Sequence, residues 1–191
     1  MKRIVILGAP GAGKGTQSKK IVEYLNVPHL ATGDMFRELM SGDSALGKQA
    51  RTYIDQGQLV PDEIVNEMVR KRLLACDRNG GFLLDGYPRN LIQAHALNHV
   101  LDDMGVDLDA VIELKVDKEE LIARLLKRAE IEGRSDDTEP VIRNRMEVYR
   151  RETKPITAFY ETEHVMNVVD GMGTAEDVWA RIQSVLDGKN S

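Results

Sequence analysis

Short apolar runs alternate with longer segments of helical periodicity along most of this chain. The first run is continuously apolar and ends in glycine, which is typical of a strand buried on both faces. We expect five such runs to form strands, at residues 4–7, 27–31, 81–85, 110–114 and 164–169. Helical patterns occupy residues 14–25, 34–40, 43–56, 62–76, 91–102, 118–129, 138–163 and 174–186. This alternation predicts an α/β fold, with a five-stranded parallel sheet and helices on both of its faces.

Two segments depart from a simple alternation. Residues 32–60 insert two helices after the second strand, and residues 127–137 interrupt a helical pattern with a glycine and several charges. Both are expected to be peripheral inserts on one core, a usual position for parts that close over a ligand. The chain of 191 residues shows no repeat and no linker, so we expect a single domain.

Composition narrows the functional classes. With 26 Lys and Arg against 31 Asp and Glu, the formal charge is −5, which disfavours a nucleic-acid partner but allows a local cationic pocket. The single cysteine, Cys76, excludes an internal disulfide and a zinc site built on several thiolates. No apolar stretch reaches the roughly 18 residues of a membrane span. The first apolar run ends too early for a signal peptide, so no membrane partner and a cytoplasmic location are expected.

Residues 8–14 (GAPGAGK) match the phosphate-loop pattern G-x-x-x-x-G-K. They lie between a predicted strand and a predicted helix, which is the context that the pattern requires. Glycines let backbone N–H groups surround a phosphate, and the helix N-terminus and Lys14 add positive charge. The alternative is a glycine-rich turn with an exposed lysine. A dinucleotide-binding fingerprint would need glycine where Thr16 stands, and Gly15 replaces the usual Mg²⁺-binding Ser or Thr.

Three further motifs follow predicted strands or turns: residues 32–37 (TGDMFR), 57–62 (GQLVPD) and 85–89 (DGYPR). In the first, Thr32 or Asp34 could simply cap a helix and Arg37 could be solvated. Asp85 stands at the carboxyl end of a buried strand, where α/β sheets bind ligands, although it too could cap a helix. Gly173 lies in a glycine turn before the last helix, with Thr174 as a candidate cap.

Residues 8–17 (GAPGAGKGTQ) resemble the phosphate loop of adenylate kinases, in which glycine after the lysine is normal and Mg²⁺ is held largely through water. The resemblance covers essentially the whole chain, because the other motifs occur in the same order. It implies a three-layer P-loop kinase fold, with a five-stranded parallel sheet flanked by helices. The implied parts are a core (1–30, 61–126 and 138–191), a helical insert that binds the nucleoside monophosphate (31–60) and a short lid (127–137).

The same resemblance implies the site residues. The ATP-binding residues would be Gly11, Ala12, Gly13, Lys14, Gly15, Thr16, Arg128 and Gly173. The AMP-binding residues would be Thr32, Arg37, Gln58, Leu59, Val60, Gly86, Tyr87, Pro88, Arg89, Gln93, Arg134 and Arg145. The catalytic cations would be Lys14, Arg89, Arg128, Arg134 and Arg145, and Asp85 would hold water on Mg²⁺.

Other basic and metal-binding residue types have a simpler interpretation. Lys127, Arg143, Arg150 and Arg151 are expected to form solvated helix faces. The four histidines show no ligand spacing and are expected to be structural or exposed. The short lid lacks cysteines, so no structural zinc is expected.

The implied reaction is the reversible transfer of the terminal phosphoryl group of ATP to AMP, giving two ADP, in adenine nucleotide homeostasis. The family is usually monomeric. One alternative is a UMP/CMP kinase, but those enzymes usually carry alanine and isoleucine where this chain has Thr32 and Leu59. Another is a non-enzymatic nucleotide switch, which would need an N-K-x-D motif and Ser or Thr after Lys14, and both are absent.

Overall fold

The computed structural model describes residues 2–76, 80–132 and 138–188. Its centre is a five-stranded sheet of order β2-β3-β1-β4-β5 in which every pair is parallel, as the alternation of elements predicts. The strands are β1 (Arg3–Gly8), β2 (His29–Ala31), β3 (Phe82–Asp85), β4 (Ala110–Lys115) and β5 (Met166–Asp170). Each lies within a few residues of its predicted range.

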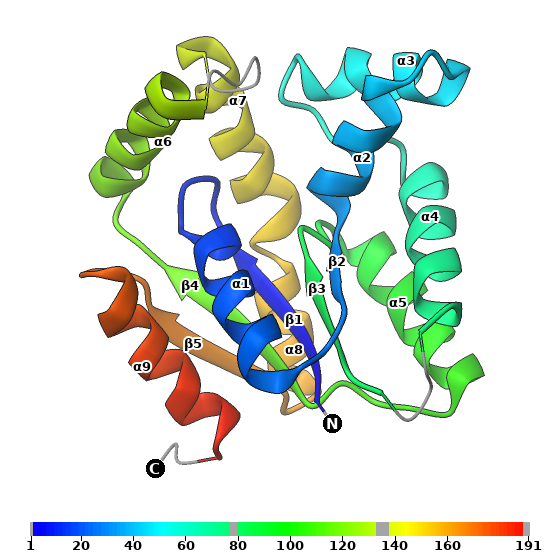
Figure 1. Ribbon diagram of the computed structural model, residues 1–191, viewed down its shortest axis with the longest axis vertical. Helices are drawn as coiled ribbons and strands as arrows, with labels where there is room; N and C mark the ends of the chain where they lie inside the picture. The colour runs from blue at the N-terminus through cyan, green and yellow to red at the C-terminus, as the bar shows by residue number, and fades with distance from the viewer. Residues whose placement is uncertain (1, 77–79, 133–137, 189–191) are drawn as a thin grey trace.

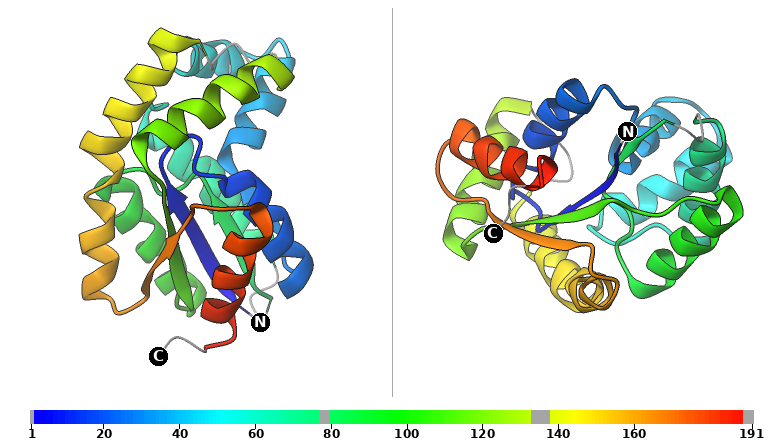
Figure 2. Two further views of the ribbon diagram at one scale, coloured as in Figure 1. Left: turned by 90° about the vertical axis from the view of Figure 1, so that its left-hand side faces the viewer. Right: turned by 90° about the horizontal axis from the view of Figure 1, so that it is seen from below.

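Helices cover both faces of this sheet (Figures 1 and 2). Their bounds are α1 (Lys14–Leu25), α2 (Thr32–Ser41), α3 (Ala45–Ile54), α4 (Asp62–Leu74), α5 (Leu91–Met104), α6 (Lys118–Glu132), α7 (Glu139–Val148), α8 (Ile156–Thr162) and α9 (Ala175–Leu186). Seen from below, α1 and α9 lie on one side of the sheet and α5 and α8 on the other (Figure 2). The three-layer α/β architecture is therefore confirmed.

Strand β1 shows how the sequence pattern produces these layers. Ile4 and Ile6 belong to the apolar cluster formed with α1 and α9, whereas Val5 and Leu7 belong to the cluster formed with α4, α5 and α8. Ile4, Val5 and Ile6 are completely buried. Because successive side chains point to opposite faces of a strand, a run that is apolar at every position must be covered on both faces.

Two arms rise above the carboxyl ends of the strands (Figure 1). One consists of α2 and α3, which form residues 32–54 of the predicted insert, and the other of α6 and α7. The phosphate loop between β1 and α1 lies below the arm of α6 and α7 in Figure 1. The sheet therefore brings the predicted chemical groups to one edge, and the arms flank that edge.

The prediction of one continuous helix over residues 138–163 is wrong. The structure divides this segment into α7, a π-helical turn η2 (Tyr149–Thr153) and α8. Pro155 cannot donate to the carbonyl four residues before it and its ring crowds that carbonyl. The helix widens into a π turn before Pro155, where the N–H of Lys154 donates to the carbonyl of Tyr149, five residues back, at 2.9 Å.

No helix within the described ranges is both long enough and apolar enough to cross a lipid bilayer.

Leu84 in β3 is fully buried in the cluster beneath α4 and α5, whereas Leu74 at the end of α4 is 45% exposed. We expect Leu84→Ala to lower the free energy of unfolding by about 2–5 kcal/mol, because it removes buried methyl groups and leaves a cavity. Leu74→Ala, the matched control, should change it by less than about 0.5 kcal/mol. Urea denaturation of both variants measures the difference, and equal losses would contradict the described core.

Candidate active site

The loop between β1 and α1 has the geometry of an anion cradle. Gly13 adopts a left-handed conformation (φ 93°), and α1 starts directly after it without a side-chain cap. A side chain at Gly13 would be strained by this φ angle. The first turn of α1 therefore leaves N–H groups uncapped beside Gly15 and Thr16, both of which are exposed. Uncapped amides at a helix N-terminus are suited to bind phosphate.

Lys14 lies across this loop among other cations. Its Nζ donates to the carbonyls of Gly8 at 2.7 Å and Ala9 at 3.2 Å. The pKa of Lys14 is lowered to about 8, chiefly by burial and further by the charges of three arginines, against the opposing effect of Asp85. These arginines come from different elements: Arg89 follows β3, Arg128 is on α6 and Arg145 is on α7. Four of the five predicted cations, Lys14 and these three arginines, therefore lie together at the phosphate loop.

Asp85 is held as a carboxylate at the end of β3. Ser18 of α1 donates to its Oδ2 at 2.9 Å, and His29 Nε2 lies 3.5 Å from the same oxygen. Burial alone would raise the pKa of Asp85, but His29, the Lys14 charge and Ser18 together bring it below its usual value. The side chain lines the cleft and caps no helix, so its position is that of a charged group available to a ligand.

The acceptor side of the predicted site is built from side-chain contacts to the backbone. The Thr32 hydroxyl donates to the carbonyl of Gly86 at 2.9 Å, so Thr32 does not cap α2, and neither does Asp34. Arg89 Nε donates to the same carbonyl at 2.8 Å. Gln93 is buried; its Nε2 donates to Asp62 and its Oε1 accepts from the backbone N–H of Arg89, both at 2.8 Å. These contacts fix the segment after β3 against α2 and α5.

The exposed side chains of Arg37 and Asp34 form an ion pair on α2. Both residues line the same cleft as Thr32, Arg89 and Gln93.

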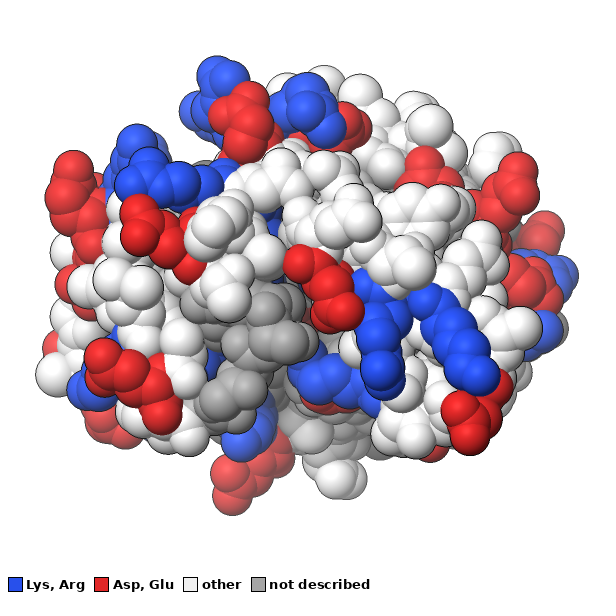
Figure 3. Space-filling model, turned by 90° about the horizontal axis from the view of Figure 1, so that it is seen from above, with Lys and Arg blue, Asp and Glu red and all other residues white. Residues whose placement is uncertain are grey.

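A single cleft of about 1090 Å³ joins these parts. Among its described lining residues, nine are Lys or Arg and three are Asp, although the whole chain is acidic. On the outer surface, by contrast, basic and acidic side chains are interspersed at the end that carries α3, α6 and α7 (Figure 3). The cleft therefore has a local positive excess suited to a polyanion. The predicted site residues that line it are Gly11, Gly13, Lys14, Gly15, Thr16, Thr32, Arg37, Gln58, Leu59, Val60, Asp85, Gly86, Arg89, Gln93, Arg128 and Arg145.

Four predicted site residues lie elsewhere. Ala12 and Tyr87 are buried, and the Tyr87 hydroxyl contacts Asn66 and the Gln93 carbonyl, so its side chain packs the core. Pro88 lines a small adjoining cavity of about 60 Å³. Gly173 is exposed in the loop before α9 and outside the cleft lining. A further predicted residue, Arg134, lies outside the described residues.

Sequence reasoning missed two features of the site. Arg124 lines the cleft on the same face of α6 as Arg128, and its spacing of four residues from Arg128 was the available signal. His29 was expected to be structural or exposed, without any link to Asp85. Lys127 is exposed, as are Arg143, Arg150 and Arg151, but Lys127 also lines the cleft. In the described part of the chain, no cluster of three or more His, Cys, Asp or Glu could hold a metal.

Comparison with known proteins agrees with this geometry. The family model for adenylate kinases matches residues 6–165. The chain belongs to the adenylate kinase family. It is 50% identical over 187 residues to an adenylate kinase of Thermobifida fusca, covering 98% of this chain and 99% of the relative. An adenylate kinase of Kocuria rhizophila is 49% identical, with 98% and 100% covered, and one of a Nocardioides species is 47% identical, with 97% of each covered.

The lowered pKa of Lys14 generates a pH prediction for an adenylate kinase phosphate loop. Below pH 8 the free lysine is mostly charged, and above it the lysine is mostly neutral. A bound polyphosphate raises this pKa, so affinity must fall as pH rises through 8. With ATP as the probe, we expect affinity to drop about tenfold between pH 7 and pH 9.

Calorimetric titrations at pH 7, 8 and 9 test this, since binding near pH 8 should also take up about half a proton per ATP. Lys14→Met should bind ATP more weakly at pH 7 and without this pH step. A wild-type affinity that stays constant from pH 7 to pH 9 would contradict the lowered pKa.

Proposed function

We propose that this protein transfers the terminal phosphoryl group of ATP to AMP, reversibly and with Mg²⁺, to give two ADP. The observation that carries the proposal is the convergence of Lys14, Arg89, Arg128 and Arg145 on one cleft. A cluster of cations on a phosphate loop would serve any nucleotide-binding protein. Arginines supplied by three segments other than the phosphate loop favour a second phosphate-bearing substrate, and membership of the adenylate kinase family favours AMP.

The acceptor pocket would lie between α2 and the segment after β3. Thr32, the 58–60 segment and Gln93 would contact the adenine of AMP, and Arg37 and Arg89 would bind its phosphate. Arg89 is already held by its contact with Gly86, which reduces the entropy lost on binding. Arginine suits this role because its planar fork binds two oxygens of one phosphate. Tyr87 and Pro88 would support the pocket through packing.

The donor pocket would lie on the other side of Lys14. The backbone of residues 11–13, with Gly15 and Thr16 at the start of α1, would surround the β-phosphate of ATP, and Arg128 would contact the outer phosphates. The lid residue Arg134 is proposed from the resemblance alone. The base of ATP would extend toward Gly173.

Transfer needs no general base in this arrangement. An anionic oxygen of the AMP phosphate attacks the γ-phosphorus of ATP, and the bond from that phosphorus to the β–γ bridging oxygen breaks. The cations neutralise the charge that spreads over the transferring group, and each charge-assisted contact contributes roughly 1.5–3 kcal/mol. Positioning and electrostatic stabilisation therefore supply the catalysis.

Asp85 is a suitable residue to hold Mg²⁺ in this site. Its carboxylate lies near Lys14, is held ionised and could bind the metal through water. The ion would shield charge on the β- and γ-phosphates when bound. Because Gly15 replaces the usual hydroxyl ligand, Asp85 is the main protein group for this role.

Residues 31–60 and 127–137 would close over the substrates and exclude water, which would otherwise hydrolyse ATP. A monomeric state and a cytoplasmic location are further parts of this proposal.

The decisive experiment compares AMP, CMP and UMP as acceptors with MgATP as donor. We expect AMP to be phosphorylated with the highest kcat/KM by a wide margin, at least about tenfold. Preference for CMP or UMP would instead indicate the pyrimidine alternative. No transfer to any acceptor, with ATP still bound, would indicate a nucleotide-binding module.

Arg89→Ala should reduce turnover with ATP and AMP at least about tenfold, because it removes a positive charge that stabilises the transferring phosphoryl group. Arg150, an exposed residue paired with Glu147, provides the matched control, and Arg150→Ala should leave turnover within about twofold. Circular dichroism melting checks that both variants fold. Wild-type turnover in folded Arg89→Ala would remove Arg89 from the mechanism.

A further inference from the structure

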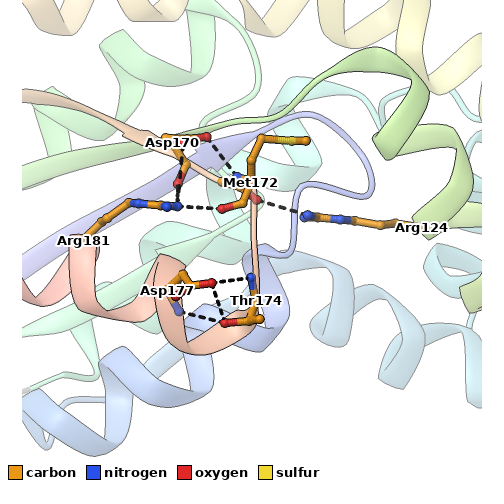
Figure 4. Close-up of polar contacts among 7 residues, drawn as sticks. Arg124, Asp170, Met172, Thr174, Asp177 and Arg181 are labelled. Carbon is orange, nitrogen blue, oxygen red and sulfur yellow. Dashed lines mark hydrogen bonds and ion pairs between the residues drawn. The ribbon is translucent and has the colours of Figure 1, made fainter.

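The loop between β5 and α9 is held by an arginine of α9. Arg181 Nη1 donates to the carbonyl of Asp170 at 2.8 Å and to that of Met172 at 2.6 Å (Figure 4). The same nitrogen lies 3.8 Å from the Asp170 carboxylate, which in turn accepts from the backbone N–H of Met172 at 3.0 Å. One guanidinium therefore bridges both sides of a tight turn.

Two other elements hold the same loop. From α6, Arg124 Nη2 donates to the carbonyl of Gly171 at 3.2 Å, and the N–H of Gly171 donates to the carbonyl of Lys115 at 2.8 Å. From α1, the buried Gln17 side chain donates to the carbonyl of Ala175 at 2.9 Å. The loop is thereby held at a fixed position relative to the helix that begins at the phosphate loop.

A capping box at the start of α9 engages the backbone N–H groups of Thr174 and Asp177. Thr174 and Asp177 form a reciprocal capping box, in which the N–H of Thr174 donates to Asp177 Oδ2 at 2.9 Å. Gly173 has φ 99°, and a Cβ there would lie 3.0 Å from that same oxygen. Glycine is therefore the residue type that permits both this φ angle and the close approach of the Asp177 carboxylate.

Gly173 is the exception in this network. Within the described residues, its N–H and C=O take part in none of the hydrogen bonds that hold the loop, and the residue is exposed. The loop thus presents one backbone donor and one backbone acceptor on a rigid support. Adenine carries an amino donor where guanine carries a carbonyl acceptor. A peptide group fixed with its C=O toward the exocyclic group of the purine accepts from the adenine amino group and repels the guanine oxygen, whereas a peptide group free to turn could present its N–H to guanine instead.

We propose that Arg181 is a positioning residue for donor-base selectivity: by holding the carbonyls of Asp170 and Met172, it fixes the peptide groups of Gly173 against the donor base. Arg181 acts through the loop and touches no substrate. The inference rests on the proposed function, in which the base of ATP reaches Gly173. Without Arg181 the turn loses two charge-assisted hydrogen bonds, and Gly173 can then rearrange to accept either purine.

The test uses Arg181→Met, which keeps the apolar stem and removes both donors. Initial rates are measured with ATP or GTP as donor and AMP as acceptor. We expect the KM for ATP to rise about tenfold, with kcat and the KM for AMP within about twofold of wild type. The ratio of kcat/KM for ATP over GTP should fall at least about fivefold. Arg181→Lys, whose ammonium lacks the planar fork, should give an intermediate ratio.

Arg143→Met is the matched control, since Arg143 is an exposed arginine that forms an ion pair with Glu139 on its own helix. It should leave the ratio of kcat/KM for ATP over GTP and the KM for ATP unchanged. Melting temperatures separate folding from positioning, because a merely structural role would lower stability without changing the ATP-to-GTP ratio. That result, or equal rises in the KM for ATP and AMP, would overturn the inference.

If the wild-type protein transfers no phosphate to AMP, the proposed function itself fails. If the wild type is active and Arg181→Met leaves the ATP-to-GTP ratio unchanged, only the role of Arg181 is removed.

Discussion

Repulsion among like charges is the central constraint on this structure. Lys14 lies close enough to Arg89, Arg128 and Arg145 for their charges, together with burial, to bring its pKa to about 8. Such a cluster cannot be stabilised by contacts among its own members, so other parts of the fold must hold it. Each cation comes from a different element, and α6 and α7 are anchored by apolar residues such as Leu125 and Ile142, which are almost fully buried. The cost of assembling the charges is offset by the core, and a bound polyanion would relieve it.

The parallel sheet determines where this cluster can form. The register pairs Ile6 of β1 with Asp85 of β3, so the phosphate loop and the Asp85 segment emerge side by side at one edge. Helices cover both faces, which leaves the carboxyl ends of the strands and the flanking arms as the place for polar chemistry. The same arrangement brings both Ser18 and His29 to the Oδ2 atom of Asp85, which favours the charged carboxylate.

Backbone groups are fixed by side chains in two loops, by different means. After β3, the neutral side chains of Thr32 and Gln93 hold the segment. Before α9, Arg124 and Arg181 hold the loop through its carbonyls. Groups held before a ligand arrives need little reorganisation when it binds, which is the physical basis of both affinity and selectivity in such sites.

The sequence by itself determined the strands, most helices and the phosphate loop, because periodicity, glycine spacing and Lys14 are local features. Most of the site residues implied by the motifs also line the cleft, but they make up only half of its described lining. It did not separate Tyr87, which packs the core, from its neighbour Arg89, which lines the cleft. Nor did it reveal the contacts of His29 with Asp85 or of Arg181 with Met172. Only the tertiary structure decided these, because which side chains meet across elements depends on register and packing, and these follow from the burial of the whole chain.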